Sequence, residues 1–256
     1  MRTIWALSKL VIKEIFRKKD FYVVLILTLV ILLYAGQLQF YHVENIIRYL
    51  KEIGLALIFL SSVILTVSLA ARQYPLEIHN RTFNVLMAKP VARYQFILGK
   101  FCGVSLAGIT CLLIFLALFT LLTLTKSDSF SPILSIQMAY LFCLSLMVLS
   151  AMTIAFSFYL TYSANVALSL ILYLLMSTYG ATLKQSSTHL SWTFNYLGSA
   201  CYYLLPHFEF FDLRQRFIHE WAPISLGLMG VVTVYAFVYT TFFILTGWTL
   251  FKKRFL

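Results

Sequence analysis

Long uncharged runs of apolar residues dominate this chain and limit the folds that it can adopt. The runs cover residues 21–41, 53–71, 101–125, 129–183 and 221–251. Each is long enough to span a bilayer, because about 20 apolar residues in a helix cross a hydrocarbon core roughly 30 Å thick. Of the 256 residues, 61% are hydrophobic and only 11% are charged, so the surroundings of the chain are lipid rather than water.

The longest run predicts two helices rather than one. Residues 129–183 exceed the length of a single membrane-spanning helix and match the length of two. The best break is TYSAN at 161–165, a cluster of small and polar residues that suits a tight turn. The sequence therefore predicts an all-α polytopic membrane protein with one domain, 1–256, and six transmembrane helices at 21–41, 53–71, 101–125, 133–160, 165–183 and 223–250.

The distribution of Lys and Arg predicts how these helices are oriented. Basic residues cluster at the N-terminus, in the segment 72–100 and in the C-terminal FKKRFL, whereas basic and acidic residues balance in the other connections. The net charge of +11 is thus confined to one side of the membrane, and the positive-inside rule makes that side cytoplasmic. We expect both termini in the cytoplasm. This asymmetry explains the basic excess without nucleic-acid binding.

Two segments outside the spans are predicted to lie at the membrane surface. In residues 2–17, apolar and basic side chains fall on opposite faces of a helix, so 1–20 is expected to form an amphipathic elbow. Residues 184–222 are rich in aromatics but are interrupted by Pro206, so we expect one or two short helices at the outer interface. This segment suits an outer gate or, equally, a packing element. The gate candidates are Leu205, Pro206, Phe208 and Phe211.

The sequence lacks the patterns that ion coupling, metal binding and catalysis require. No predicted span has an interior Asp, Glu, Lys or Arg, which argues against ion-coupled transport. The His residues lack ligand spacing, so no metal site is expected, and most Cys fall in apolar runs, which argues against disulfides. Gly99 and Lys100 lack the earlier glycine and the following Ser or Thr of a P-loop. We therefore expect a non-catalytic chain without a cofactor of its own.

The segment EIHNRTFNVLMAKPVARYQFILGK, residues 77–100, is too short and too polar to be another span. Asn80 suits the N-cap of a short helix, and Pro90 interrupts the hydrogen bonding of a helix. We expect a second helix to begin near residue 91 and to continue into the third span. Apolar side chains such as Phe83, beside a charged rim, make the cytoplasmic loop 72–100 a suitable docking element for a soluble partner.

This loop resembles the signature of the ABC-2 type export permeases. In that family the loop has an acidic residue, Asn or Gly before x-Thr, paired leucines, Lys-Pro-Val-Ser-Arg and a final Leu-Gly-Lys. The matching positions are Glu77, Asn80, Thr82, Leu86, Lys89, Pro90, Val91, Arg93, Gly99 and Lys100. The chain departs from the pattern at His79, where an acid is common, and at Ala92, where Ser is usual. The six spans, the amphipathic start and LPHFEFFDL at 205–213 are also similar, so the resemblance covers essentially the whole chain.

The resemblance implies the permease subunit of an ATP-binding-cassette exporter in a prokaryotic cell (inner) membrane. ATP and Mg²⁺ would bind to a separate cytosolic ATPase subunit, and a second permease copy, identical or paralogous, would complete the transport path. The loop would act as a coupling helix. Its expected contacts with the ATPase are Glu77, Asn80, Arg81, Thr82, Phe83, Lys89 and Arg93, and its expected structural residues are Pro90, Gly99 and Lys100.

Two other functions are weighed against export. An assembly or scaffold subunit would use the same loop and the same ATPase to drive a periplasmic process without moving a solute. A membrane-embedded lipid enzyme would need nucleophilic or charged groups gathered at one membrane face, and the sequence shows none. The hydroxyl-bearing residues of the fourth and fifth spans either line a path or pack helices in lipid; they are Ser145, Ser150, Thr153, Ser157, Ser163 and Ser169.

Overall fold

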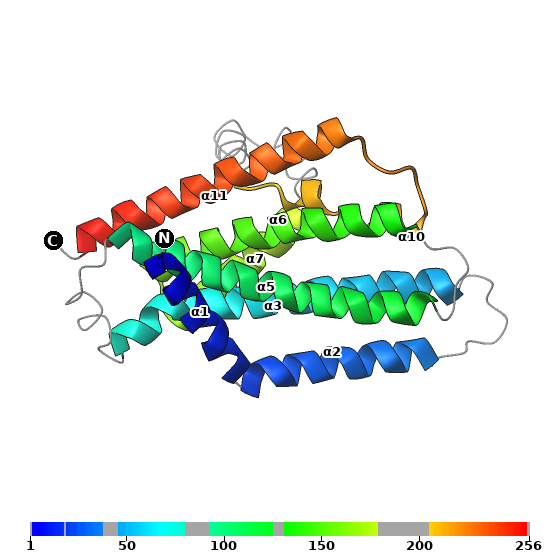
Figure 1. The fold of residues 1–256 in the computed structure, drawn as a ribbon, viewed down its shortest axis with the longest axis horizontal. Coiled ribbons are helices and arrows are strands. Elements are labelled where there is room, and N and C mark those ends of the chain that lie inside the picture. Colours follow the sequence, from blue (N-terminus) through cyan, green and yellow to red (C-terminus); the bar gives the residue numbers. More distant parts are fainter. Residues whose placement is uncertain are drawn as a thin grey trace, which may run out of the picture.

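The computed structural model describes residues 2–17, 19–37, 46–79, 93–124, 131–178 and 205–254. Every regular element in these ranges is a helix, which confirms the all-α prediction (Figure 1). The helices are α1 (Arg2–Arg17), α2 (Lys19–Gln37), α3 (Ile46–His79), α5 (Arg93–Leu124), α6 (Pro132–Ser157), α7 (Tyr162–Thr178), the 3₁₀ helix η1 (Phe208–Phe211), α10 (Arg214–Ile218) and α11 (Leu226–Arg254).

Four helices in the described ranges are long and apolar enough to cross a membrane. Their apolar stretches are Lys51–Pro75 of α3, Tyr94–Leu124 of α5, Pro132–Ser157 of α6 and Leu226–Lys252 of α11. α2 and α7 are apolar helices of 19 and 17 residues. At 1.5 Å per residue they extend about 28 Å and 26 Å, close to the thickness of the hydrocarbon core. These helices support a membrane-embedded protein.

The long helices lie side by side and alternate in direction along the longest axis of the molecule (Figure 1). At one end of this bundle, α3 ends, α5 begins and α11 ends, and α1 lies at the same end. We call it the loop end, because residues 80–92 connect α3 to α5 there. We call the opposite end, where α10 lies and α11 begins, the outer end, after the orientation that the sequence predicts.

The turn that the sequence predicts inside the longest apolar run is present. α6 ends at Ser157 and α7 begins at Tyr162, so the turn comes a few residues before the predicted position. Asn165 lies inside α7, where its Nδ2 donates to the carbonyl oxygen of Thr153 at 3.0 Å and its Oδ1 accepts from Ser169 at 3.2 Å. A polar residue is stable in this buried position because the amide joins α7 to α6.

Two helices are longer than the spans that the apolar runs predict. α3 continues eight residues beyond position 71 to His79, and α5 already begins at Arg93 instead of at position 101. Residues 93–100 of the loop segment are thus the start of α5, in agreement with the predicted second helix. Residues 72–79 continue α3, with Pro75 inside the helix. Both helices therefore extend towards the predicted coupling loop.

The hydroxyl groups of α6 pack inside the bundle. Ser145, Ser150, Thr153 and Ser157 are buried, and each donates to a carbonyl oxygen of its own helix at distances between 2.6 and 3.0 Å. Ser163, in contrast, is exposed. Within this single chain, the α6 hydroxyls favour the interpretation as packing residues over the interpretation as the lining of a path.

The amphipathic helix α1 packs across α5. Its residues Leu7, Ser8 and Val11 are buried, whereas Trp5 is 65% exposed. Gly103 of α5 permits this contact, because a Cβ at that position would lie 2.7 Å from the Cβ of Val11. The predicted helix is therefore confirmed, and part of its apolar face contacts protein rather than lipid.

Candidate functional site

The predicted coupling residues fall only partly within the described ranges. Asn80, Arg81, Thr82, Phe83, Lys89 and Pro90 lie outside the described residues. Glu77 lies in the last turn of α3 and Arg93 is the first residue of α5, so the helices on both sides of the loop are defined. Gly99 and Lys100 lie within α5, about two turns from its start.

A buried lysine joins the two helices that carry the loop. Lys100 Nζ donates to Gln73 Oε1 at 3.0 Å, and Gln73 Nε2 donates to the carbonyl oxygen of Leu69 at 3.2 Å. Lys100 and Gln73 are each only 5% exposed. Lys100 Nζ also lies 5.8 Å from the centroid of the Phe96 ring. A charged donor makes a stronger hydrogen bond than a neutral one, so this contact holds α3 against α5 at the base of the loop.

A group of buried rings connects this bond with α6 and α11. Tyr74 of α3 packs on Phe158, which follows α6, with the ring centroids 4.6 Å apart. Phe251 of α11 lies 5.6 Å from Phe158, and 6.1 Å and 6.3 Å from Phe96 and Tyr74. We call Tyr74, Phe96, Phe158 and Phe251 the aromatic cluster. Because close-packed side chains transmit displacement, a movement of α3 or α5 at this end acts directly on α6 and α11.

Arg72 extends these contacts to α7. Its Nε donates to the carbonyl oxygen of Ser68 at 3.1 Å, and its guanidinium carbon lies 5.7 Å from the ring centroid of Tyr162, the first residue of α7. The end of α3 beside the loop is therefore in contact with α5, α6, α7 and α11.

The bond between Lys100 and Gln73 gives a first testable prediction. We expect Lys100→Met to lower the free energy of unfolding by about 1–3 kcal/mol, because Gln73 Oε1 would lose this donor at a buried position. The double variant Lys100→Met/Gln73→Leu is expected to recover part of the loss. Thermal unfolding of both single variants, the double variant and the wild type in detergent measures the coupling. Strictly additive losses would contradict it, and Lys252→Met, at an exposed position, is the control.

At the outer end, the gate candidates belong to a compact outer segment, residues 205–225. Pro206, Phe208 and Phe211 are buried, and Leu205 is half-buried. Phe208 packs on Tyr173 of α7, with ring centroids 5.0 Å apart. The short helices η1 and α10 follow Pro206, as the sequence predicts. Phe211 also packs on Tyr235 of α11, so the gate candidates lie against α7 and α11.

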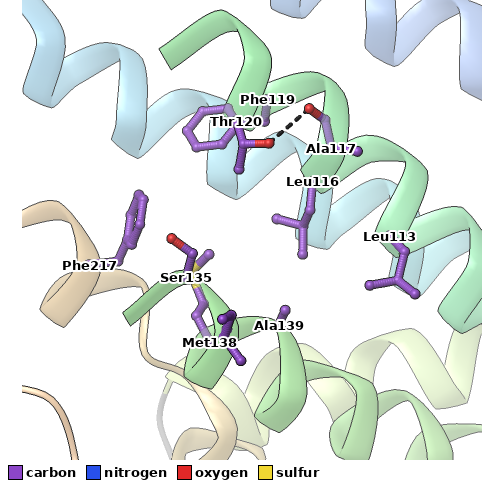
Figure 2. Close-up of a pocket in the computed structure, with 10 residues that line it drawn as sticks. Leu113, Leu116, Ala117, Phe119, Thr120, Ser135, Met138, Ala139 and Phe217 are labelled. Carbon is purple, nitrogen blue, oxygen red and sulfur yellow. Dashed lines mark hydrogen bonds between the residues drawn. The ribbon is translucent and has the colours of Figure 1, made fainter. Parts of the chain in front are cut away.

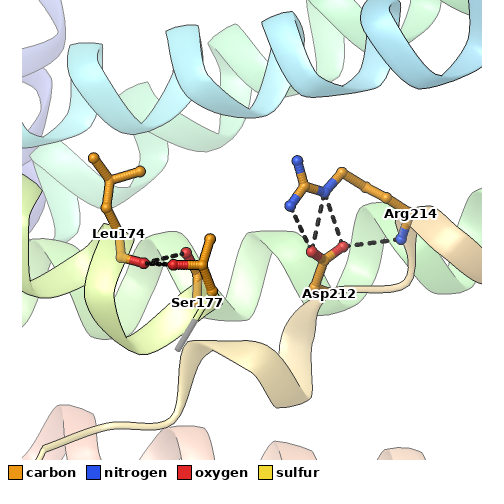
Figure 3. A network of polar contacts seen from close by, with 5 residues as sticks. Leu174, Ser177, Asp212 and Arg214 are labelled. Carbon is orange, nitrogen blue, oxygen red and sulfur yellow. Dashed lines mark hydrogen bonds and ion pairs between the residues drawn. The ribbon is translucent and has the colours of Figure 1, made fainter. Parts of the chain in front are cut away.

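An ion pair inside the outer segment lies against α3. Arg214 makes a two-pronged contact with Asp212, through Nε at 3.0 Å and Nη2 at 2.6 Å, and the backbone N–H of Arg214 donates to the same carboxylate at 2.9 Å (Figure 3). The Arg214 guanidinium carbon lies 5.4 Å from the ring centroid of Phe59 in α3. Burial alone would lower the pKa of Arg214, but the hydrogen bonds and charge of Asp212 outweigh it and raise this pKa.

Further contacts attach the outer segment to three long helices. Lys51 Nζ of α3 bonds to Glu220 Oε1 at 2.9 Å. On α6, Gln137 Nε2 donates to the carbonyl oxygen of Ile224 at 2.9 Å, and its Oε1 accepts from the N–H of the same residue at 3.0 Å. On α11, the hydroxyl of Tyr235 accepts from the backbone N–H of His207 at 2.8 Å. The outer segment therefore contacts the same helices that meet at the aromatic cluster.

The paired contacts of Gln137 give a second prediction. We expect Gln137→Leu to lower the free energy of unfolding by about 1–3 kcal/mol, because Ile224 would lose the side-chain partner of both its N–H and its C=O. Limited proteolysis of the purified protein is expected to cut the outer segment faster. Gln215→Leu, at an exposed position in the same segment, serves as the control. Equal cutting rates in both variants would contradict the prediction.

The chain was compared with known proteins, and neither comparison identifies a relative. No family model matches the chain, and no curated protein matches it significantly. A function for this chain is therefore inferred from the contacts described above and from the sequence pattern.

Sequence analysis misses the residues that surround Lys100. Gln73 and Tyr74 fall just after the second apolar run, Phe158 falls inside the longest run, and Phe251 falls at the end of the last one. Lys100 is the last residue of the polar segment 72–100, directly before an apolar run. Gln73, Tyr74, Lys100 and Phe251 thus share a position at the edge of an apolar run, whereas the position of Phe158 inside a run gives no such signal.

Proposed function

We propose that this protein is the permease subunit of an ATP-driven exporter in a prokaryotic inner membrane, with six spans and the loop end in the cytoplasm. A separate cytosolic ATPase would dock on the coupling loop 72–100, and a second permease copy would complete the path. The alternating helices support this topology, because α1 and the end of α11 lie at the loop end with the predicted coupling loop (Figure 1). Exposed Lys9, Lys13 and Lys252 lie at that end as well, in agreement with the positive-inside rule.

The observation that carries the proposal is the connection at the base of the loop. A docking loop drives a membrane protein only if its displacement reaches the spans. Lys100 and Gln73 join the two helices that flank the loop, and the aromatic cluster joins these helices to α6 and α11. An ATPase that pushes or rotates the loop would therefore move several spans together, as in a two-state change carried by rigid elements.

The outer segment supplies the other half of the proposed mechanism. Its contacts Lys51–Glu220 and Arg214–Phe59 reach α3, and its contact Gln137–Ile224 reaches α6. A shift of α3 relative to α6 cannot keep these contacts at their present lengths. In the proposed cycle, ATP-driven movement at the loop end loosens the outer segment, and the burial of Phe208 and Phe211 marks the closed state.

Co-purification tests this proposal. The tagged chain is isolated in mild detergent from its native membrane as wild type and as Arg81→Ala/Lys89→Ala/Arg93→Ala. The control, Lys9→Ala/Lys13→Ala/Lys252→Ala, removes as much positive charge from α1 and α11 at the same end of the molecule. We expect a P-loop ATPase to accompany the wild type and the control but not the loop variant. An ATPase that is absent from all three, or lost equally from both variants, would contradict docking on the loop.

One observation favours an assembly or scaffold subunit as the second candidate. The α6 hydroxyls are buried and bonded to their own backbone, so in this chain they form no polar lining. The two functions differ when the purified complex is reconstituted in vesicles. Movement of a lipid-linked or soluble fluorescent probe that depends on ATP supports export, whereas ATP hydrolysis without any such movement supports assembly.

A further inference from the structure

An apolar cavity of ≈ 190 Å³ lies between α5 and α6, beside Phe217 of α10 (Figure 2). Leu113, Leu116 and Phe119 contribute the α5 wall, and Met138 and Ala139 contribute the α6 wall. We propose that this cavity binds one acyl chain of a membrane phospholipid. The inference does not depend on the proposed transport function.

The lining selects an apolar ligand. Of the residues around the cavity, only Thr120 and Ser135 carry polar side chains. Thr120 Oγ1 donates to the carbonyl oxygen of Ala117 at 2.9 Å, and Ser135 Oγ donates to that of Ser131 at 2.9 Å. Both donors are thus used within their own helices (Figure 2 shows the first). A polar ligand would lose its hydrogen bonds to water in this cavity without gaining others, which costs free energy.

The position of the cavity identifies hydrocarbon as the medium at its opening. Its walls belong to the apolar stretches Tyr94–Leu124 and Pro132–Ser157, both long enough to cross a membrane. At its edge, Leu113 is 49% exposed and Ile136 is 69% exposed. Large apolar side chains that are exposed on membrane-spanning helices face lipid tails. We infer that an acyl chain reaches the opening from the bilayer.

The size of the cavity and the position of Phe217 suit the binding of an acyl chain. An apolar cavity of about 150 Å³ in a soluble protein binds benzene, so a cavity of ≈ 190 Å³ accommodates a short stretch of methylene groups. Phe217 is only 4% exposed, and Lys51 Nζ lies 5.7 Å from its ring centroid while bonded to Glu220. Phe217 therefore lies between the cavity and Lys51 of α3, so an acyl chain would enter from the other side, between α5 and α6.

Photolabelling tests the site. The full-length protein is reconstituted in phosphatidylglycerol vesicles that contain a trace of phosphatidylglycerol with a diazirine in one acyl chain, and labelled residues are mapped by peptide mass spectrometry. We expect the walls at 113–120 and 135–139 to be labelled at least threefold more than the exposed residues Val234 and Phe237 of α11. Equal labelling of the two regions would overturn the proposal, because ordinary contact with lipid would explain it.

Filling the cavity provides the matched variant. Ala139→Leu occupies the space from α6, and Ala117→Leu occupies it from α5 in case the first variant does not fold. Each is expected to reduce labelling of the cavity walls at least threefold and to leave labelling of α11 unchanged. Ala167→Leu, at an exposed position of α7, is the control. Unchanged labelling of the walls in a folded filled variant would overturn the proposal, as would labelling by a diazirine fatty acid but not by the phospholipid.

Discussion

Replacing Phe251 with Ala is expected to lower the free energy of unfolding by about 3–5 kcal/mol, the usual cost of removing a buried Phe ring. Phe251 is fully buried in the aromatic cluster, where it contacts rings from α3, α5 and the end of α6. The substitution leaves a cavity at the point where these helices meet. Thermal unfolding of the purified protein in detergent measures the loss.

The control for this prediction is another phenylalanine of the same helix. Phe237 of α11 is 53% exposed, and Phe237→Ala is expected to change the unfolding temperature little. The reason is that this ring is surrounded by apolar detergent both in the folded and in the unfolded protein. If the proposed coupling is correct, Phe251→Ala also keeps the ATPase bound but reduces ATP-dependent movement of the probe. Equal stability of the two variants would contradict the account of the aromatic cluster.

Replacing Gly108 with Ala is expected to lower the free energy of unfolding by about 1–3 kcal/mol through overpacking. A Cβ at this position of α5 would collide with Thr66 Oγ1 of α3 and lie 3.3 Å from its Cγ2. Thr66 is fully buried, and its hydroxyl donates to the carbonyl oxygen of Ser62 at 2.7 Å, so the side chain does not move aside easily. Gly108 thus allows α3 and α5 to approach closely.

A compensating variant makes the prediction about Gly108 specific. Thr66→Ala removes both atoms that lie closest to the new Cβ, so Gly108→Ala/Thr66→Ala is expected to be more stable than Gly108→Ala alone. Gly230→Ala on α11 is the control, because a Cβ there meets no other atom within 4 Å. Thermal unfolding in detergent of the wild type, both single variants, the double variant and the control measures these stabilities. A double variant less stable than both single variants would contradict the proposed close approach.

The helices were predictable from sequence to the extent that their lengths follow the apolar runs. The helix content, the turn before Tyr162 and the short helices η1 and α10 follow from local residue patterns. The early start of α5 at Arg93 agrees with the second helix that the sequence predicts from near residue 91, but the continuation of α3 to His79 was not predicted, because it depends on packing. Tyr74 and Phe96 stabilise these extensions by burying their rings against Phe158 and Phe251, residues that are distant in the sequence.

The candidate site was predictable only in part, for the same physical reason. The loop stood out because it is basic, short and interrupted by Pro90, and Lys100 stood out as its last charged residue. The partner of Lys100 is on a different helix, so no local pattern indicates Gln73. Likewise, the outer segment showed its aromatic residues in the sequence, but Lys51 and Gln137 bind it from positions far earlier in the chain.

The most direct test of the central claim uses a photoreactive amino acid in the intact cell, at position 83 of the loop or at position 210 of the outer segment. Phe83 is a predicted contact of the ATPase, whereas Phe210 is 49% exposed in η1, beside Tyr235 of α11 and outside the coupling loop. The account predicts that the probe in place of Phe83 crosslinks to a P-loop ATPase and that the probe in place of Phe210 does not. An ATPase captured from neither position, or from position 210 alone, would contradict it.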